Sequence, residues 1–196
     1  MRAFKTEKRL AKIESVIRAR QHSLTVVFEN IHDPHNVSAM LRTCDAVGVQ
    51  NVSLIYSIEK FPRISRISSA SANKWITREN FKNVSDCYSS LRKKGFKIYA
   101  SALTEGSKNL YNIDFTGKSA VVLGNEHRGV SKEAAEQADE IFHIPMNGMV
   151  QSLNVSVANA VILYEIFRQR FQLGMYPSKD LSEIEIEKQI DEWCKK

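Results

Sequence analysis

An amide and a guanidinium lie close together in the stretch DPHNVSAMLRTCDAVGV at residues 33–49, just after the strand-like run SLTVVFENI. Asn36 and Arg42 are six positions apart on a short amphipathic segment. A guanidinium stays protonated in proteins and binds phosphate oxygens, whereas an amide both donates and accepts hydrogen bonds. Asn36 therefore either orients a polar group near Arg42 or serves as the N-cap of the helix expected after Pro34.

Two further polar segments follow strand-like runs. LGNEHRGVS at 123–131 comes after SAVV, and IPMNGMVQSLNVS at 144–156 comes after EIFH. Ligands of open α/β sheets bind beyond the carboxyl ends of the strands, so the polar residues of all three segments are expected to share one crevice.

The sequence lacks the motifs of several other kinds of nucleotide-binding, hydrolytic and metal sites. GNEHRG has neither the G-K-[ST] of a P-loop nor the G-x-G-x-x-G of a dinucleotide site, and no G-x-S-x-G is present. His32 and His35 have no third ligand at hand, so we expect no metal site.

Strand-like and helix-like segments alternate along the chain, which predicts an α/β fold: a mostly parallel sheet with helices on both faces. Gly48 and Gly95 are expected to follow helix ends, and Ser131 is an expected N-cap with Glu133 in the first turn. The basic, Ser-rich stretch 57–75 has no periodicity and predicts a functional loop. The expected strands lie at 23–31, 51–57, 96–101, 119–124 and 140–145, and helices at 85–94 and 154–170.

The termini predict helical extensions of a single domain. Leu10, Ile13 and Ile17 follow helical spacing near the N-terminus, and Ile186, Ile190 and Trp193 do so in a final helix from Leu181. We therefore expect a basic extension at 1–20, a core domain at 21–175 and a C-terminal extension at 176–196. The segment 154–170 is apolar nearly all round, which predicts burial by the domain or by another subunit.

Composition indicates a cytoplasmic protein. No apolar run is long enough to cross a bilayer, and no secretory signal is evident. A mitochondrial presequence is disfavoured by Glu7 and Glu14 in the basic start. The cysteines are three, scattered and without C-x-x-C spacing, so neither disulfides nor zinc are expected.

Positive charge gathers in two windows. Residues 1–20 hold seven Lys and Arg against two acidic residues, and residues 60–78 hold five and no acid, although the whole chain carries only +6. The second window also contains Phe61 and Trp75, a mixture typical of contacts with phosphates and bases. We interpret the windows as contacts to a nucleic acid; the alternative is a solvated helix face and a solubilising loop.

Taken together and in this order, the three polar segments resemble the SpoU-type branch of the SPOUT superfamily of RNA 2′-O-methyltransferases. The matching motifs stand here as NVSAMLR, GNEHRG and IPMNGMVQSLNVSVA, within a core of residues 24–170. The resemblance implies a homodimer that binds S-adenosylmethionine, without a metal, in a deep C-terminal trefoil knot spanning about 120–170. Pattern reasoning alone would not suggest a knot, since knotted chains are rare.

The flanking segments look like the branch that methylates guanosine 18 in the D-loop of tRNA. They are the short basic N-terminal helix, SASANKWI, FRQR and the C-terminal helix. Asp33 and Arg128 depart from the pattern, at positions where a basic residue and an aromatic residue occur, which bears on the selection of tRNA. Alternatives are 2′-O-methylation of another tRNA or rRNA nucleotide, a non-catalytic RNA-binding knot protein, and a nucleotide-dependent enzyme acting on a small molecule.

The resemblance also implies roles for individual residues. Arg42 would deprotonate the ribose hydroxyl; because guanidinium is always charged, the alternative is that Arg42 clamps a phosphate and stabilises the developing alkoxide. Glu126 would face the cofactor or brace the loops, and Asn154 would join the site or only cap its helix. The implied catalytic residues are Arg42, Asn36, Glu126, Ser152 and Asn154. The implied cofactor pocket consists of Leu103, Gly124, Ile144, Met146, Ser152 and Leu153.

Basic residues complete the expected site. Arg168 and Arg170 near the end of a helix favour its dipole, and in a dimer they would reach the partner's tRNA. The expected RNA-binding residues are Lys5, Lys8, Arg9, Lys12, Lys74, Arg168 and Arg170.

Overall fold

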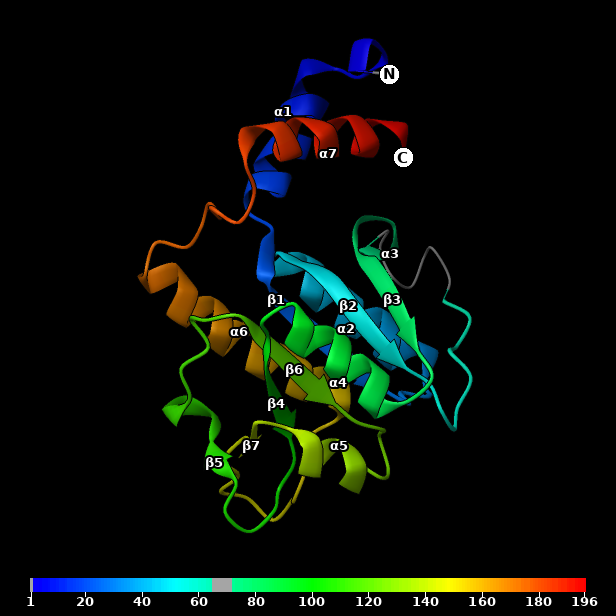
Figure 1. Cartoon of the computed structure of the whole chain (residues 1–196), viewed down its shortest axis with the longest axis vertical. Helices are drawn as coiled ribbons and strands as arrows, with labels where there is room; N and C mark the ends of the chain where they lie inside the picture. The colour runs from blue at the N-terminus through cyan, green and yellow to red at the C-terminus, as the bar shows by residue number, and fades with distance from the viewer. Residues whose placement is uncertain (1, 65–71) are drawn as a thin grey trace.

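A seven-stranded parallel sheet forms the centre of the protein (Figure 1). The computed structural model describes residues 2–64 and 72–196. The strand order is β3-β2-β1-β6-β4-β7-β5, so that β1 and β6 pair at the middle. The strands are β1 (Gln21–Glu29), β2 (Val49–Ile55), β3 (Thr77–Phe81), β4 (Lys97–Ser101), β5 (Lys108–Asn109), β6 (Ser119–Leu123) and β7 (Glu140–His143).

Helices cover both faces of the sheet, as the α/β prediction requires. One apolar cluster joins the sheet to α2 and α6, and another joins it to α4 and α5. The helices are α1 (Glu7–Arg18), α2 (Pro34–Ala46), α3 (Ala72–Trp75), α4 (Val84–Lys93), α5 (Lys132–Gln137), α6 (Val155–Gln172) and α7 (Glu183–Lys195), with the 3-10 turns η1 (Arg2–Phe4) and η2 (Leu110–Asn112).

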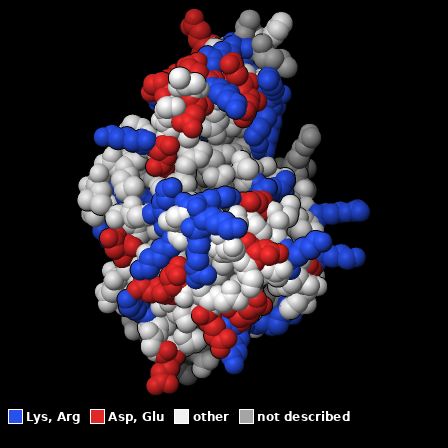
Figure 2. All heavy atoms as spheres, viewed as in Figure 1, with Lys and Arg blue, Asp and Glu red and all other residues white. Residues whose placement is uncertain are grey.

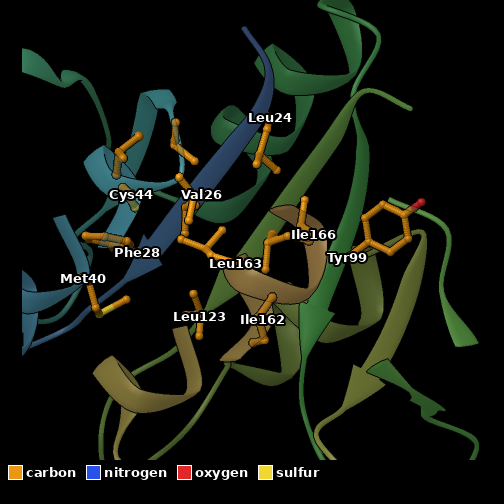
Figure 3. Close-up of a cluster of buried hydrophobic side chains, with 14 of the residues drawn as sticks. Leu24, Val26, Phe28, Met40, Cys44, Tyr99, Leu123, Ile162, Leu163 and Ile166 are labelled. Atoms are coloured by element: carbon orange, nitrogen blue, oxygen red, sulfur yellow. The ribbon is translucent and has the colours of Figure 1, made fainter. Parts of the chain in front are cut away.

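The larger cluster packs α2 and α6 side by side against one face of β1 (Figure 3). Val26 and Phe28 point to this face of β1, whereas Val27 points to the α4 side, as the two-residue period of a strand dictates. Met40 of α2 and Ile162 of α6 are fully buried in the same cluster. The position of α2, which carries Asn36 and Arg42, is therefore set by apolar packing.

Sequence patterns do not predict the edges of the sheet. β3 pairs with β2 at one edge, and the two-residue β5 pairs with β7 at the other. All but one of the β3 residues are exposed, so TRENF shows no alternation of apolar and polar residues. The expected loop 57–75 ends at Ala72, where α3 begins, and its residues 65–71 lie outside the described part of the chain.

The expected helix ends at glycine are confirmed. Gly48 follows the C-cap of α2 with a φ of +83°, in the left-handed region that favours glycine. A Cβ atom there would lie 2.6 Å from the carbonyl oxygen of Ala19. The chain can therefore turn from α2 into β2 only by passing closely against the segment that enters β1.

The two terminal helices pack against each other and form a lobe at the amino ends of the strands (Figure 1). Ile13 and Ile17 of α1 are buried with Ile186, Ile190 and Trp193 of α7, which confirms both predicted apolar stripes. Arg18 of α1 also pairs with Glu183 of α7 at 2.8 Å.

Arg170 joins the end of α6 to the start of β1. Its side chain is 0% exposed and donates to the carbonyl oxygens of Phe115, Gly117 and Ser23 at 2.7–3.1 Å. It also donates to the side chains of Gln21 and Ser23. Burial lowers its pKa, and the five hydrogen bonds satisfy a guanidinium that would otherwise be costly to bury.

Replacing Arg170 should destabilise the fold. Arg170→Met leaves buried carbonyl oxygens without donors, and the free energy of unfolding is expected to fall by about 2–4 kcal/mol. Urea denaturation measures this change. The control Lys188→Met removes an exposed cation of α7 and should leave the midpoint unchanged. Equal midpoints for the two variants would contradict a structural role for Arg170.

Candidate active site

The three polar segments meet at the carboxyl edge of the sheet. Phe28 pairs with Leu123 at the ends of β1 and β6. Just beyond them, the Asn125 side-chain amide donates to the carbonyl oxygen of Asn30 at 2.8 Å. The third segment, after β7, approaches through Asn154. Residues separated by about a hundred positions are thus hydrogen-bonded to one another.

A chain of three side chains connects the segments. The Asn36 amide nitrogen donates to the Glu126 carboxylate at 3.1 Å, and the Asn154 amide nitrogen donates to the Asn36 carbonyl oxygen at 3.1 Å. Glu126 also accepts hydrogen bonds from the backbone N–H groups of His32 and Asp33, both at 3.0 Å. One carboxylate therefore holds the loop before α2 and the side chain of Asn36 together.

Two expectations about helix caps have different outcomes. The N-cap of α2 is Asp33, which accepts from the His35 N–H at 2.7 Å, so the N-cap interpretation of Asn36 is wrong. Asn36 lies inside the helix, where its buried amide serves the polar chain instead. Asn154 does cap α6, accepting from the Ser156 N–H, and also bonds Asn36.

Arg42 lies apart from this polar chain. Six residues along an α-helix correspond to about 9 Å of rise and to a different face of the helix. Asn36 is buried and bonded to Glu126 and Asn154, whereas Arg42 is exposed. Among residues 2–64 and 72–196, no side-chain partner of Arg42 is found, so its five N–H groups remain available to a ligand.

The six residues expected to hold the cofactor all line one cavity. Its volume is about 300 Å³, at the lower end of the range for small-molecule sites. Leu103 follows β4, Gly124 follows β6 and Ile144 follows β7, so three strand ends contribute walls. The remaining residues of the set come from the segment that leads into α6, namely Met146, Ser152 and Leu153.

Gly124 shapes this cavity by the absence of a side chain. A Cβ atom at Gly124 would lie 2.1 Å from the backbone of Gly129 and Val130. The loop therefore folds back onto itself, stabilised by the Gly129 N–H bonded to the Asn125 carbonyl oxygen at 2.8 Å. The tight loop fits the expected cofactor, because backbone groups and the apolar walls of Leu103, Ile144 and Leu153 are available to an adenosine.

Two asparagines organise the site although sequence reasoning does not single them out. The Asn30 side-chain oxygen accepts from the backbone N–H groups of Ser57, Ile58 and Glu59 at 3.1–3.2 Å, which ties the loop after β2 to β1. Asn125 bonds Asn30 and its own loop. Their shared signal is an Asn one or two residues after a strand, in FEN and LGN.

The two departures from the family pattern also have structural roles. Asp33 caps α2. Arg128 lines the cavity and pairs with Glu59 at 3.0 Å. Glu59 in turn lies 3.4 Å from the His32 ring. Arg128 thus links the loop after β6 to the loop after β2.

The expected RNA-binding residues fall into different environments. Lys8, Arg9, Lys12 and Lys74 are exposed, and Lys5 is half-buried. Arg168 is held by Glu165 at 2.8 Å and by Gln172 at 2.7 Å. The prediction that Arg170 contacts RNA is wrong. Its side chain is fully buried and donates hydrogen bonds to β1 and to the chain before β6, so RNA cannot reach it.

Metal-binding clusters and membrane spans are both missing from the described ranges 2–64 and 72–196. There, His, Cys, Asp and Glu form no group of three or more that could hold a metal ion. The helices in the same ranges are too short or too polar to cross a membrane.

The pKa of Glu126 is lowered in the folded protein. Burial acts to raise it, but the hydrogen bonds from His32, Asn36 and Asp33 to the ionised carboxylate outweigh that effect. A carboxylate whose pKa is lowered on folding contributes stability above its unfolded pKa of about 4.3, and this is lost as the pH falls through the folded value.

Glu126→Gln should remove this contribution. The variant is expected to unfold at lower urea concentration than the wild type at pH 7, and the difference should shrink as the pH falls below about 4. The exposed carboxylate of Glu136 on α5 provides the control, because Glu136→Gln should change neither the urea concentration at the midpoint of unfolding nor its dependence on pH. A difference for Glu126→Gln that stays constant with pH would rule out the ionised brace.

Comparison with known proteins agrees with this geometry. The SpoU rRNA Methylase family model matches residues 23–164. The tRNA (guanosine(18)-2′-O)-methyltransferase of Thermus thermophilus is 43% identical over 98% of both chains. A crystal structure of the A. aeolicus TrmH/SpoU tRNA modifying enzyme has a TM-score of 0.90 and 41% identity, covering 96% of both chains. An AdoMet-bound rRNA methyltransferase from Sinorhizobium meliloti has a TM-score of 0.65 and 26% identity, covering 78% of this chain and 59% of that one. This chain belongs to the SpoU methylase family.

Proposed function

We propose that this protein transfers a methyl group from S-adenosylmethionine to the ribose 2′-hydroxyl of guanosine 18 in tRNA. The single observation that carries the proposal is that six residues from four segments line one cavity beside the polar chain of Glu126, Asn36 and Asn154. The relative from Thermus thermophilus, similar over almost the full length, is named for this activity.

S-adenosylmethionine bound in the cavity supplies an electrophilic methyl group. Gly124 permits the close backbone turn, while Ile144 and Leu153 offer apolar walls to the adenosine. Ser152 lies at the cavity wall, two residues before Asn154, the N-cap of α6. The Ser152 hydroxyl and the N–H groups of the first turn of α6 suit a polar part of a ligand. The cavity residues thus position S-adenosylmethionine and exclude water from it, and they take little part in the chemical step.

Arg42 acts on the RNA. Its exposed guanidinium binds the phosphate next to the reacting ribose and stabilises the negative charge that develops on the 2′ oxygen. The proton leaves through that phosphate or through water, because a guanidinium is a poor base at neutral pH. Holding the oxygen at attack distance supplies a large part of the rate.

Asn36, Glu126 and Asn154 act as positioning residues. The hydrogen bonds to Asn36 use one amide hydrogen and the carbonyl oxygen, which leaves its second amide hydrogen for a ribose or a phosphate. Glu126 fixes the start of α2 by its two backbone bonds. The three residues therefore set the orientation of the helix from which Arg42 extends.

The basic face of the N-terminal lobe binds tRNA away from the reacting nucleotide. Lys8, Arg9 and Lys12 are exposed on α1, with Lys5 preceding the helix and Lys74 on α3. Their charge is suited to the phosphate backbone. Arg168 is a candidate for the same role if RNA displaces it from Glu165.

The proposal also includes a knotted C-terminal region and a cytoplasmic location. Residues 120–170 form the trefoil knot, supported by β6 and β7 lying on either side of β4 while α6 packs against α2. A tRNA substrate implies a cytoplasmic location. The alternatives are methylation of another tRNA or rRNA nucleotide and a non-catalytic role in RNA binding.

Two copies of the chain form a dimer through α6. Val157, Tyr164 and Phe171 recur every seven residues and are 48%, 54% and 60% exposed. Phe167 stacks against Phe171 at 5.5 Å between ring centroids, which extends the apolar face. A stripe of this kind on one helix favours contact with a second copy.

Methylation of guanosine 18 is tested with defined tRNA transcripts. Methyl-labelled S-adenosylmethionine should label one nucleotide, and a transcript with deoxyguanosine at position 18 should stay unlabelled. Arg42→Ala should lower the rate at least about 100-fold because a charge-stabilising donor is removed, while binding of S-adenosylmethionine stays within a few-fold. Arg92→Ala, on α4, serves as the matched control. Labelling elsewhere would redirect the proposal to another nucleotide, and tRNA binding without labelling would indicate a non-catalytic protein.

The dimer is tested by analytical ultracentrifugation. The wild type should sediment as a dimer at micromolar concentration, and Tyr164→Arg as a monomer, because a charge in the apolar face must be desolvated. Ile184→Arg changes an 82% exposed residue of α7 and should remain dimeric. A monomeric wild type would refute this part of the proposal.

A further inference from the structure

His143, the last residue of β7, lines the candidate cofactor cavity, although it is not among the six residues expected there. Its ring nitrogen Nδ1 lies 2.9 Å from the hydroxyl oxygen of Ser107, in a partly buried position. This distance is typical of a well-formed hydrogen bond. The two residues are 36 positions apart, so the bond joins the end of β7 to the loop that follows β4.

The loop after β4, residues 102–107, supplies one wall of the cavity through Leu103. It lies beside β5 and β7, at the end of the sheet away from the terminal lobe (Figure 1). Leu103 is 70% exposed, and every residue from 103 to 106 is exposed as well. Apolar packing therefore does not hold this wall, and its position depends on how the two ends of the loop are attached.

Both ends of the loop are attached to β7. At the first end, the backbone N–H of Ala102 donates to the carbonyl oxygen of Phe142 at 2.9 Å. At the second end, the Ser107 side chain bonds His143. The Ser107 N–H also donates to the Thr104 carbonyl oxygen at 3.1 Å, which closes a turn inside the loop. The following strand, β5, pairs with β7 over only two residues, so it adds few backbone hydrogen bonds to this attachment.

Ion pairs also connect these strands, but at the opposite end of β7. Lys and Arg side chains gather at the centre of the face that carries α4 (Figure 2). Lys97, at the start of β4, pairs at 3.0 Å with Glu140, the first residue of β7, and Lys108 of β5 pairs with the same carboxylate. Both lysine side chains are more than half exposed, and exposed ion pairs stabilise a structure only weakly. The bond between Ser107 and His143 is the attachment that lies beside the cavity.

The chemistry of the two groups lets this bond form in either tautomer of the ring. A neutral imidazole has one N–H donor and one acceptor nitrogen, and a hydroxyl group both donates and accepts. Ser107 can therefore pair with Nδ1 whether or not that nitrogen carries the hydrogen. Within the described part of the chain, no partner is found for the other ring nitrogen, Nε2.

We propose that His143 is a positioning residue for S-adenosylmethionine, because its bond to Ser107 fixes the loop 102–107 and so places Leu103 at the cavity before the cofactor arrives. The proposal rests on the function proposed above and adds a residue to it. A loop that already has its binding conformation loses less conformational freedom when the ligand binds. The bond thus raises the affinity for the cofactor without any contact with the reacting atoms.

Ser107→Ala and His143→Phe test this bond by calorimetric titration with S-adenosylmethionine in the absence of RNA. Each variant should bind about 3–10-fold more weakly than the wild type, the effect expected for one lost hydrogen bond. His143→Asn keeps a polar group near the position of Nδ1 and should recover most of the affinity. The control Ser89→Ala removes an exposed hydroxyl of α4 outside the cavity lining and should bind like the wild type.

Double variants show whether the two side chains act as one unit. Ser107→Ala combined with His143→Phe should bind no more weakly than either single variant, because both remove the same bond. In a Leu103→Ala background, Ser107→Ala should cause no further loss, because the side chain that the bond places is already absent. Independent, multiplying losses in both combinations would overturn the proposal.

Kinetics and unfolding separate positioning from a purely structural role. In the methyl-transfer assay, the KM for S-adenosylmethionine should rise by the factor seen in binding, whereas kcat should fall by a smaller factor. A lower urea midpoint with unchanged affinity would mean that the bond serves only the fold, and would overturn the proposal. Weak binding by both His143 variants, with normal binding by Ser107→Ala, would mean that the ring contacts the cofactor directly, and would also overturn it.

Failure of this inference is distinct from failure of the proposed function. If the wild type methylates guanosine 18 and all variants bind S-adenosylmethionine equally well, the role of His143 is refuted and the proposed function stands. If the wild type binds S-adenosylmethionine but methylates no tRNA, the proposed function fails, while the titrations still decide the role of His143. A wild type that does not bind S-adenosylmethionine would refute both.

Discussion

The parallel pairing of β1 with β6 is the interaction on which the candidate active site depends. These strands are separated by most of the domain, yet their ends align at Phe28 and Leu123. The alignment lets Asn125 reach the carbonyl oxygen of Asn30 and lets Glu126 reach the backbone of His32 and Asp33. A slip of the register by one residue would turn every side chain to the other face, and neither hydrogen-bonded link could form.

Burial makes these polar contacts decisive. Asn30, Asn36 and Asn125 are each less than a tenth exposed, so their amide groups must be satisfied within the protein. Each of these amides is hydrogen-bonded to a loop residue of another segment, where no pairing of strands joins the two segments. The result is a set of loops fixed by side chains, which explains how the cavity walls keep their shape without regular secondary structure.

The two ends of the molecule use charge in different ways. At the carboxyl edge, Glu126 is held in its ionised form by donors from the chain itself, and Arg128 is paired with Glu59. In the terminal lobe, Arg9 and Lys74 lie over the indole of Trp75, and Arg20 lies over Trp193 and is paired with Asp45. The first arrangement holds loops in place, and the second is suited to a polyanion that arrives from solution.

The sequence by itself determined the fold class, the central strands and the long helices, together with the N-caps at Ser131 and Asn154, because apolar period and cap chemistry are local properties. Ile13, Ile17, Ile186 and Ile190 are buried as their helical spacing predicts. β3 could not be anticipated, because an exposed edge strand has no apolar period and is defined only by its hydrogen bonds to β2.

The tertiary structure alone decided what the polar residues do. Asn36 links Glu126 to Asn154, and Arg170 binds β1 and the chain before β6 from the interior. Both roles depend on partners more than 50 positions away. A sequence motif gives the types and the spacing of the side chains, but not their surroundings. Whether an arginine faces solvent, as Arg42 does, or the interior, as Arg170 does, depends on which surfaces the rest of the chain covers.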